Sequence, residues 1–373
     1  MNIEFDSVVT ACEESKEGWL CILENTEFFP EQGGQTCDRG TLNGIEVKHV
    51  SIKNDVIYHL MECPIQVGTK VHGEIDFEHK FRNMQMHSGE HIFSGTAHKL
   101  YNATNVGFHL SENSATMDFD VKLDREQIET IEKKVNDYIY DNLPIIVSFP
   151  TKEELVNIDY RSKKEIDGQV RLVEIPGVDI CACCAPHVER TGEIGLFVVT
   201  SFENYKGGVR LNYLAGRRAF EYVKEQREAL KSIRGTLEVK SGLEAEAVEK
   251  MAEANRSLSF SVIELKNKAV ADEIKRSYET NPNAEDGLWI GEANQAEAMK
   301  SAMNALHSCY SGVCAAFCGK ENEYQYFMEG PVDKLSSIVQ ILKDKYGAKG
   351  GGKPDSVRGK ATITESEIRD LFN

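Results

Sequence analysis

Two histidines and a later cysteine–histidine pair have the types and spacing suited to metal chemistry. The segment "MQMHSGEHIFSG" places His87 and His91 at positions i and i+4, so that on a helix both imidazoles lie on one face. Far downstream, "DICACCAPHVERTGEIG" repeats this spacing with Cys183 and His187. Three imidazoles and one thiolate are a suitable tetrahedral ligand set for zinc. The paired spacing therefore predicts one Zn²⁺ per chain, bound by these four side chains.

Other chemistry is compatible with the same stretches. Cys181 and Cys184 form a C-x-x-C pair, which can serve as a redox dithiol, although the thioredoxin-like start that usually accompanies it is not visible. The letters "HSGEH" match the H-x-x-E-H pattern of a metallopeptidase, with Glu90 as general base. Such a peptidase needs a downstream carboxylate ligand and leaves Cys183 and His187 without a role. A third alternative is a purely structural zinc, because four protein ligands close the coordination sphere.

The bulk composition is that of an ordinary globular protein. The chain has 373 residues, of which 41% are hydrophobic and 28% charged, and its length suggests two or three domains. We expect neither a secretory signal nor a membrane partner, because the N-terminus has no basic and apolar signal pattern and no apolar run approaches about 20 residues. The ten cysteines are then expected to be reduced thiols, which predicts a cytoplasmic location.

Charge is distributed unevenly along the chain. The net charge of −17 disfavours indiscriminate binding to nucleic acid. Residues 343–360, however, carry six lysines or arginines against two aspartates, and they include "GAKGGGKPDSVRG". We expect a glycine-rich basic loop here, in which glycines let the backbone approach phosphates and basic side chains pair with them. The residues expected to contact a polyanion are Lys349, Gly350, Gly351, Gly352, Lys353 and Arg358.

Hydrophobic periodicity divides the chain into four parts. Residues 1–80 contain short strand-like segments separated by Gly, Asn and Asp turns, which predicts a small β-barrel or sandwich. Residues 81–215 mix helical and strand patterns, as in an α+β domain. Residues 216–280 are rich in helix formers with heptad-like apolar spacing, which fits a helical hairpin, a dimerising coiled coil or a linker packed on its own domain. Residues 281–373 have the pattern of a small α/β unit.

Four motifs, in this order, resemble the editing half of alanyl-tRNA synthetase. They are more similar to its freestanding relatives, the AlaX-type alanyl-tRNA editing proteins, in the long form with a C-terminal DHHA1 domain. The motifs are "FFPEQGGQTCDRG", "MQMHSGEH", "CCAPHVERTGEIG" and "GGGKPDSVRG". The resemblance covers essentially the whole chain and implies an α+β fold. Its expected parts are an N-terminal β-barrel (1–80), a zinc-dependent editing domain (81–215), a helical linker (216–280) and a DHHA1-like RNA-binding α/β domain (281–373).

The resemblance also implies an activity. Proteins of this family hydrolyse the ester that joins a wrong amino acid, serine or glycine, to alanine tRNA. Because the chain begins at the barrel, we expect hydrolysis without aminoacylation. The family's four zinc ligands correspond to His87, His91, Cys183 and His187. The expected pocket residues are Gly33 and Gly34, and the expected catalytic residues are Glu90 and Gln35.

Two departures from the family pattern concern the pocket. Where synthetases commonly have C-G-G-T-H, this chain has the run from Cys183 to His187 as C-C-A-P-H, and Glu90 stands where many have threonine. Both changes bear on amino-acid discrimination and leave the metal ligands in place. The expected partner is mischarged alanine-accepting tRNA, with a homodimer through the helical linker or the C-terminal domain as a further expectation. A zinc metallopeptidase and a non-catalytic RNA-binding protein with structural zinc are the alternative functions.

Overall fold

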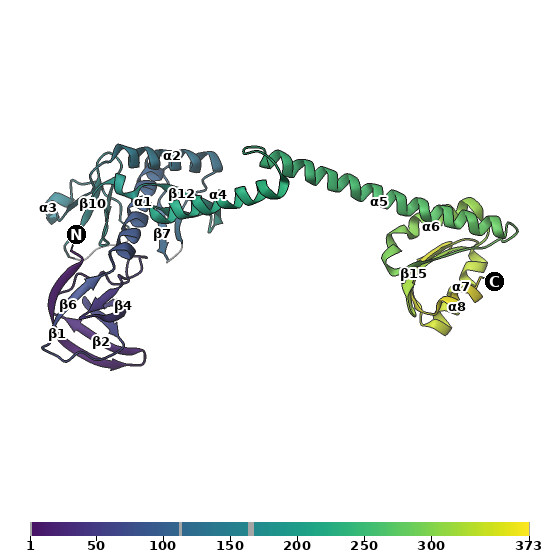
Figure 1. Ribbon diagram of the computed structural model, residues 1–373, viewed down its shortest axis with the longest axis horizontal. Helices are drawn as coiled ribbons and strands as arrows, with labels where there is room; N and C mark the ends of the chain where they lie inside the picture. The colour runs from purple at the N-terminus through teal and green to yellow at the C-terminus, as the bar shows by residue number, and fades with distance from the viewer. Residues whose placement is uncertain (1, 112–113, 163–167, 373) are drawn as a thin grey trace. The chain divides into compact units, whose positions relative to one another are not determined.

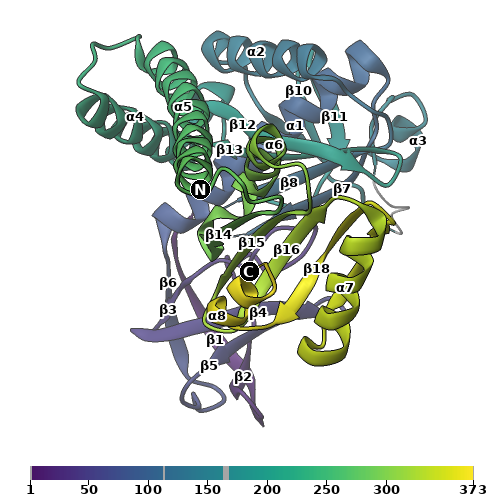
Figure 2. The same cartoon turned by 90° about the vertical axis from the view of Figure 1, so that its right-hand side faces the viewer.

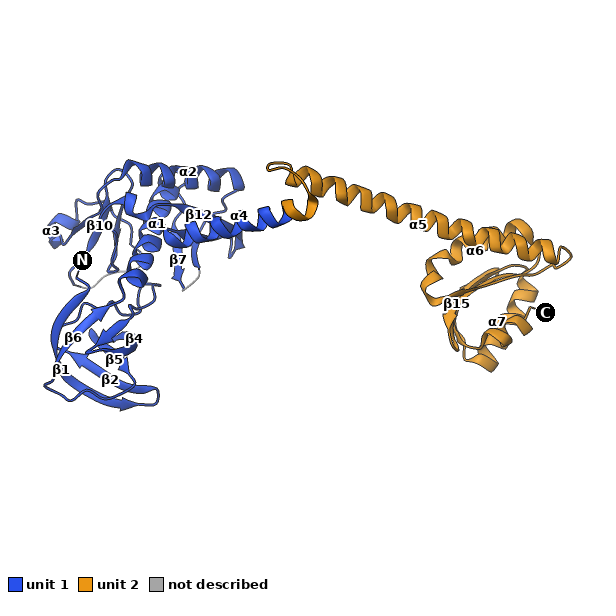
Figure 3. Cartoon of the chain, viewed as in Figure 1, with its two compact units in different colours: residues 1–233 blue, residues 234–373 orange. Residues whose placement is uncertain are grey.

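The computed structural model describes residues 2–111, 114–162 and 168–372, and the chain forms two compact units, residues 1–233 and 234–373 (Figures 1 and 3). Both units combine helices with strands, so the expected α+β class is confirmed. Each unit has hydrophobic cores of its own. Among the helices within the described ranges, none has both the length and the apolar character of a membrane span.

The first unit begins with a closed six-stranded barrel, the first of the two architectures that the turn-separated segments predict. Its strands are β1 (Glu4–Ser15), β2 (Gly18–Leu23), β3 (Gly40–Leu42), β4 (Ile45–Lys53), β5 (Val56–Met61) and β6 (Lys70–Ile75). They are arranged in the order β1-β2-β5-β4-β3-β6. The barrel interior is filled by apolar side chains such as Val9, Leu42, Val50 and Met61, because alternate residues of each strand point inward.

A buried helix, α1 (Phe77–Tyr101), follows the barrel and carries the first half of the candidate site. The Asp76 side chain accepts a hydrogen bond from the His79 backbone N–H and caps the helix, and Asn102 ends it in the left-handed conformation. Every residue of α1 between positions 83 and 97 is buried. Polar side chains in this part of the helix therefore need partners within the protein.

Two sheets and a second long helix pack around α1 (Figure 1). The elements are β7 (Asn105–Leu110), β8 (Ala115–Phe119), α2 (Arg125–Asp141), β9 (Ile146–Ser148), α3 (Lys152–Leu155), β10 (Leu172–Ile175), β11 (Asp179–Ala182), the 3-10 helix η1 (Thr191–Ile194), β12 (Phe197–Tyr205) and β13 (Gly208–Ala215). One sheet has the order β12-β13-β8-β7 and the other the order β11-β10-β9. Ile131 and Val135 of α2 pack with Phe93 and Phe197 in a shared core, which holds α1 in a fixed position.

The heptad region forms two helices, α4 (Arg217–Leu237) and α5 (Glu244–Thr280). Along α5 the heptad residues are between 44% and 67% exposed; they are Val248, Met251, Leu258, Val262 and Leu265. The last turns of α5 differ, since Val270 and Ile274 are buried with Trp289 in a core of the second unit. This end of α5 is thus packed on its own unit. Such packing agrees with the alternative in which the helical region is a linker packed on its own domain. A homodimer through the exposed heptad residues stays a prediction.

The second unit is built on a five-stranded sheet with helices on both faces (Figure 2). Its elements are β14 (Gly287–Glu292), the 3-10 helix η2 (Ala293–Ala298), α6 (Met299–Cys309), β15 (Cys314–Lys320), β16 (Glu323–Glu329), α7 (Val332–Tyr346), β17 (Lys349–Lys353), β18 (Ser356–Thr362) and α8 (Glu365–Asp370). The strand order is β14-β15-β16-β18-β17. Side chains of β15 alternate between two cores: Cys314 and Ala316 pack with α5 and α6, and Ala315 and Phe317 pack with α7 and α8.

The glycine-rich basic stretch is a β-hairpin, which corrects the expected loop. Strands β17 and β18 pair, with Gly351 opposite Arg358. A β-carbon on Gly350 would lie 2.1 Å from the carbonyl oxygen of Arg358, and one on Gly352 would lie 2.1 Å from that of Ser356. Two of the three glycines are therefore required by the close pairing of the hairpin itself, and only Gly351 has open space where its side chain would be.

Candidate metal centre

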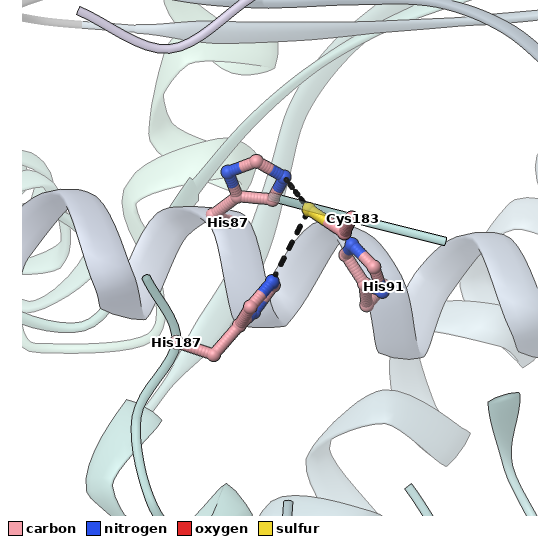
Figure 4. Close-up of side chains that lie close together, drawn as sticks. All are labelled: His87, His91, Cys183 and His187. Atoms are coloured by element: carbon pink, nitrogen blue, oxygen red, sulfur yellow. Dashed lines mark hydrogen bonds between the residues drawn. The ribbon is translucent and has the colours of Figure 1, made fainter. Parts of the chain in front are cut away.

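The four residues predicted as zinc ligands converge at one point in the first unit (Figure 4). One ligand atom from each of His87, His91, Cys183 and His187 lies within 4.8 Å of all the others. The Cys183 Sγ atom is 3.6 Å from His87 Nε2 and 3.5 Å from His187 Nε2. Sulfur at about 2.3 Å and nitrogen at about 2.05 Å from a tetrahedral zinc are roughly 3.6 Å apart. The donor set thus fits zinc in type, number and spacing.

The two halves of the cluster come from different kinds of local structure. His87 and His91 project from one face of α1, as their spacing predicts. Cys183 and His187 lie in the irregular segment after β11, so their identical spacing reflects a turn and not a helix. Arg171 Nη1 holds this turn by donating to the carbonyl oxygens of Cys183 and Ala185, at 2.6 and 3.0 Å.

Each of the three histidines has its Nδ1 atom beside an oxygen atom. The pairs are His87 with Gln35 Oε1 (2.7 Å), His187 with Ser88 Oγ (3.0 Å) and His91 with Asp179 Oδ2 (3.3 Å). The first two contacts are hydrogen bonds, whereas the third is an ion-pair contact without hydrogen-bond geometry. Hydrogen bonds of the first kind set the tautomer and orientation of a metal-binding imidazole and leave Nε2 for the ion. Sequence analysis missed Ser88 and Asp179, because their distance from the cluster is decided by packing and not by a local pattern.

The electrostatics of the cluster favour the metal-binding forms of Cys183 and His187 but the protonated form of His91. Burial opposes ionisation of Cys183, but the charge of His87 and hydrogen bonds from the surrounding histidines lower the pKa of this thiol well below its usual value. Burial, together with the charge of His91, lowers the pKa of His187 to about 3. Against the effect of burial, the neighbouring Cys181 and other anions raise the pKa of His91 well above its usual value. A bound cation would take the place of that proton beside the thiolate.

Glu90 and Gln35, the expected catalytic residues, both border the cluster. Glu90 Oε1 accepts hydrogen bonds from Ser94 Oγ at 2.8 Å and from Asn105 Nδ2 at 2.6 Å, and its Oε2 lies 3.8 Å from His91 Nε2. Gln35 is 1% exposed, and its Nε2 has no partner among the residues that the structure describes. A buried amide donor without a partner is costly, which is typical of a group kept for a ligand.

The expected pocket glycines form the turn that brings the barrel loop to α1. Gly33 and Gly34 have positive φ angles of 64° and 84°, and a β-carbon on Gly34 would lie 2.3 Å from the carbonyl oxygen of Phe108. The same loop is tied to α1 by a buried ion pair in which Lys80 Nζ lies 2.6 Å from Asp38 Oδ2. The structural role of the glycine pair is thus to form the turn that positions this loop. Contact of the glycines with substrate stays a prediction.

The basic residues predicted to bind a polyanion belong to the second unit. Lys349 lies on the wall of two cavities, of about 500 and 560 Å³, which have Lys360 and Gln325 in common. The basic side chains around the two cavities are Lys300, Lys320, Lys349, Arg358 and Lys360. Of these five, Lys349 and Arg358 were expected to contact a polyanion, and Lys360 lies in the same basic stretch. Lys300 and Lys320 were not expected, because they come from α6 and β15. Lys353 and the three hairpin glycines are exposed.

Two families of known domains match parts of this chain. The family described as threonyl and alanyl tRNA synthetase second additional domain matches residues 170–212, which include Cys183 and His187. The family described as tRNA synthetases class II (A) matches residues 2–79, the region of the barrel. The barrel region and the segment that carries Cys183 and His187 are therefore similar to domains of tRNA synthetases.

Similar proteins along almost the full length are alanyl-tRNA editing proteins. AlaX-L of Pyrococcus horikoshii is 26% identical over 99% of this chain and 94% of that protein. Aarsd1 of Mus musculus is 27% identical over 96% of this chain and 92% of that protein. The alanine–tRNA ligase of Methanobrevibacter smithii is 27% identical over 63% of this chain, which is 28% of that enzyme. The predicted resemblance is confirmed: the chain is a relative of the AlaX-type alanyl-tRNA editing proteins.

Proposed function

We propose that the protein is an aminoacyl-tRNA deacylase, which hydrolyses the ester of alanine tRNA mischarged with serine or glycine and does not aminoacylate tRNA. The observation that carries this proposal is the buried cluster of three histidines and one cysteine, with the Gln35 amide at its border. The names of the relatives, alanyl-tRNA editing proteins, support the substrate class.

The reaction mainly requires positioning and charge stabilisation, because an aminoacyl ester is already activated. A zinc ion, when bound, supplies a positive centre that can attract the amino or carbonyl group of the substrate. Four protein ligands fill a tetrahedral shell and leave no position for a zinc-bound water. We therefore propose that this centre anchors the substrate and does not activate water. The steps of hydrolysis then fall to the side chains that border the cluster.

Gln35 is proposed to donate its Nε2–H to an oxygen of the ester. Its Oε1 is held by His87, so the direction of the amide is set before the substrate arrives. A donor that needs no reorientation stabilises a developing oxyanion most effectively. Glu90, held through Oε1 by Ser94 and Asn105, is proposed to accept the proton of the attacking water through Oε2, at the border of the cluster.

A metallopeptidase of the H-x-x-E-H type is a poorer fit to the geometry. Its third ligand would be a carboxylate, and the carboxylate beside the cluster, Asp179, already accepts two hydrogen bonds from Arg161 at 2.7 and 2.8 Å. Cys183 and His187 occupy the positions beside the two helix histidines instead. The deacylase proposal gives a role to all four side chains.

The second unit is proposed to hold the body of the tRNA. Five of its basic side chains line two cavities against two acidic ones, Glu297 and Glu323, on a chain whose net charge of −17 otherwise repels nucleic acid. Phosphates of a folded RNA are the polyanion that such a surface would bind.

The decisive experiment is to incubate the protein with alanine tRNA charged with serine, glycine or alanine and to follow loss of the ester. We expect hydrolysis of the seryl ester and sparing of the alanyl ester, since polar groups that bind the serine hydroxyl reject alanine, which lacks it. Hydrolysis of the glycyl ester is measured in the same assay. Binding of tRNA without hydrolysis of any ester would replace this proposal with the RNA-binding alternative. Cleavage of peptides that depends on Glu90 but not on Cys183 would replace it with the peptidase.

A further inference from the structure

Arg161 and Asp179 form a buried ion pair directly behind His91. The guanidinium donates through Nε to Asp179 Oδ1 at 2.7 Å and through Nη2 to Oδ2 at 2.8 Å. The two side chains are 16% and 2% exposed. Asp179 Oδ2 is also the atom that lies 3.3 Å from His91 Nδ1. Because a two-point contact fixes the plane of a carboxylate, Arg161 determines how Asp179 faces the imidazole.

The position of Arg161 in the fold is held by its backbone. Its N–H donates to the Ile180 carbonyl at 2.8 Å, and its own carbonyl accepts from the Ala182 N–H at 2.9 Å. The side chain is therefore not needed to place this segment beside β11. A buried charge pair is also weak support for stability, because desolvation offsets most of its attraction. These two facts point to a role for the side chain at the site itself.

A second set of metal-binding side chains includes His91. One ligand atom from each of His91, Asp179 and Cys181 lies within 4.8 Å of the others, and all three residues are buried. An imidazole, a carboxylate and a thiol are all zinc ligand types, although this set has three members and the main cluster has four. His91 is therefore a member of both candidate ligand sets. Binding of a metal by the main cluster requires that His91 is not drawn into the second set.

We propose that Arg161 is a positioning residue that makes this decision. It holds Asp179 Oδ2 3.3 Å from His91 Nδ1, an ion-pair contact without hydrogen-bond geometry, so that the carboxylate charge faces Nδ1 and Nε2 is left for the cluster with Cys183. Figure 4 shows a ring nitrogen of His91 beside the sulfur. Arg161 also withholds Asp179 from the competing set, because both carboxylate oxygens are bonded to the guanidinium and its positive charge repels a cation. The inference rests on the metal site of the proposed function.

The test uses the full chain loaded with zinc or with cobalt(II). Zinc release is timed with a chromogenic chelator in excess, and the ligand field is read from the cobalt absorption spectrum. Loss of a partner of a metal-binding histidine costs about 10- to 100-fold in metal affinity, and we expect this loss to lie in the dissociation rate. Arg161→Gln should therefore release zinc about 10- to 100-fold faster than the unaltered protein. We expect its cobalt spectrum to change as Asp179 becomes available, and Cys181→Ala in the same background to reverse that change.

Arg210→Gln is the matched control. It breaks an ion pair of the same two-point form, with Asp118 at 2.6 and 2.7 Å, that lies outside the cluster, and it should leave release and spectrum unchanged. If Arg161→Gln does not fold, Arg161→Lys and Asp179→Asn test the same contact while keeping its charge or its shape. Release and spectra equal to those of the unaltered protein in all folded variants would overturn the inference. An unaltered protein that binds neither metal would instead overturn the proposed site.

Discussion

Gln35 Oε1 accepts a hydrogen bond of 2.7 Å from His87 Nδ1, and this contact joins the barrel loop to the metal-binding face of α1. It orients two groups at once. The imidazole is held with Nε2 toward Cys183, and the amide is held with Nε2 still without a partner among the described residues. One residue thus connects the metal cluster to the place where an ester oxygen would lie.

Replacing Gln35 with alanine should lower kcat for deacylation at least tenfold, because one preorganised donor contributes about 10²–10³ in rate. Zinc should still be present after purification, since all four ligands remain, although its release should be faster because Gln35 also orients His87. Single-turnover hydrolysis and metal analysis measure the two effects. Gln32→Ala is the control, because Gln32 contacts Gln35 through backbone atoms. A full rate in Gln35→Ala would remove the amide from the mechanism.

Cys183→Ala should lose zinc, whereas Cys181→Ala should retain it. Cys183 Sγ lies at the distance expected between two ligands of one zinc from both His87 Nε2 and His187 Nε2. Cys181 belongs to a second set, whose carboxylate is held by Arg161. Metal analysis of the two purified variants separates these cases, with unaltered protein treated with chelator as the metal-free reference. Equal zinc content in both variants would contradict the assignment of ligands.

Glu90→Gln should slow deacylation by about 10²–10⁴-fold, the usual contribution of a general base, and leave the Kd for tRNA nearly unchanged. The amide keeps an oxygen that can accept from Ser94 and Asn105, so the local packing is retained. Hydrolysis rates and tRNA binding are measured on the same preparation. The exposed residue Glu189, replaced by glutamine, serves as control. An unchanged rate in Glu90→Gln would leave the metal and amide groups as the catalytic apparatus.

Lys349→Ala combined with Lys360→Ala should weaken tRNA binding and reduce its salt dependence. These residues lie opposite each other on β17 and β18 and on the walls of both cavities. Each lost phosphate contact should lower the slope of log Kd against log salt by about one. Zinc content and hydrolysis at saturating tRNA should be spared. The control is the double variant Lys16→Ala with Lys53→Ala, in the barrel. Equal tRNA affinity in both double variants would assign the second unit another role, such as dimerisation.

The stability of the barrel should fall below neutral pH because of His59. This imidazole is buried, with Nε2 2.9 Å from Thr26 Oγ1 and Nδ1 3.2 Å from the Cys21 carbonyl, and burial lowers its pKa to about 4. Between pH 6.5 and about 4 the unfolded chain binds a proton that the folded chain does not. The contribution of neutral His59 to the free energy of unfolding is therefore present at neutral pH. It is lost as the pH falls through this window, by about 3 kcal/mol at most.

Denaturant unfolding at pH 7.5 and pH 5 measures this dependence. His59→Gln should have a smaller difference in unfolding free energy between the two pH values than the unaltered protein has. The exposed residue His98, replaced by glutamine, should leave the difference unchanged. A pH dependence that is the same in all three proteins would mean that other groups govern acid sensitivity.

The sequence by itself determined the local elements and the four candidate metal ligands, which the structure brings together. Turn-separated strands, the helix that carries His87 and His91, and the sheet-and-helix alternation after residue 281 follow from hydrophobic periods, which are properties of neighbouring residues. The repeated i, i+4 spacing of His87 with His91 and of Cys183 with His187 was a signal of the same local kind. Only the basic hairpin departed from expectation, because its glycines serve strand pairing and not a loop.

Only the tertiary structure decided which distant side chains complete the site. Ser88 and Asp179 lie within the two motifs, but no spacing rule marks them as partners of the histidines, and Arg161 lies outside both motifs. They reach the cluster because α1 is packed on several sides and β11 lies against it. Gln35 reaches His87 because a glycine turn and the buried Lys80–Asp38 pair seat the barrel loop on the helix. Contacts of this kind depend on how elements pack and in which register, and no periodicity of the chain encodes them.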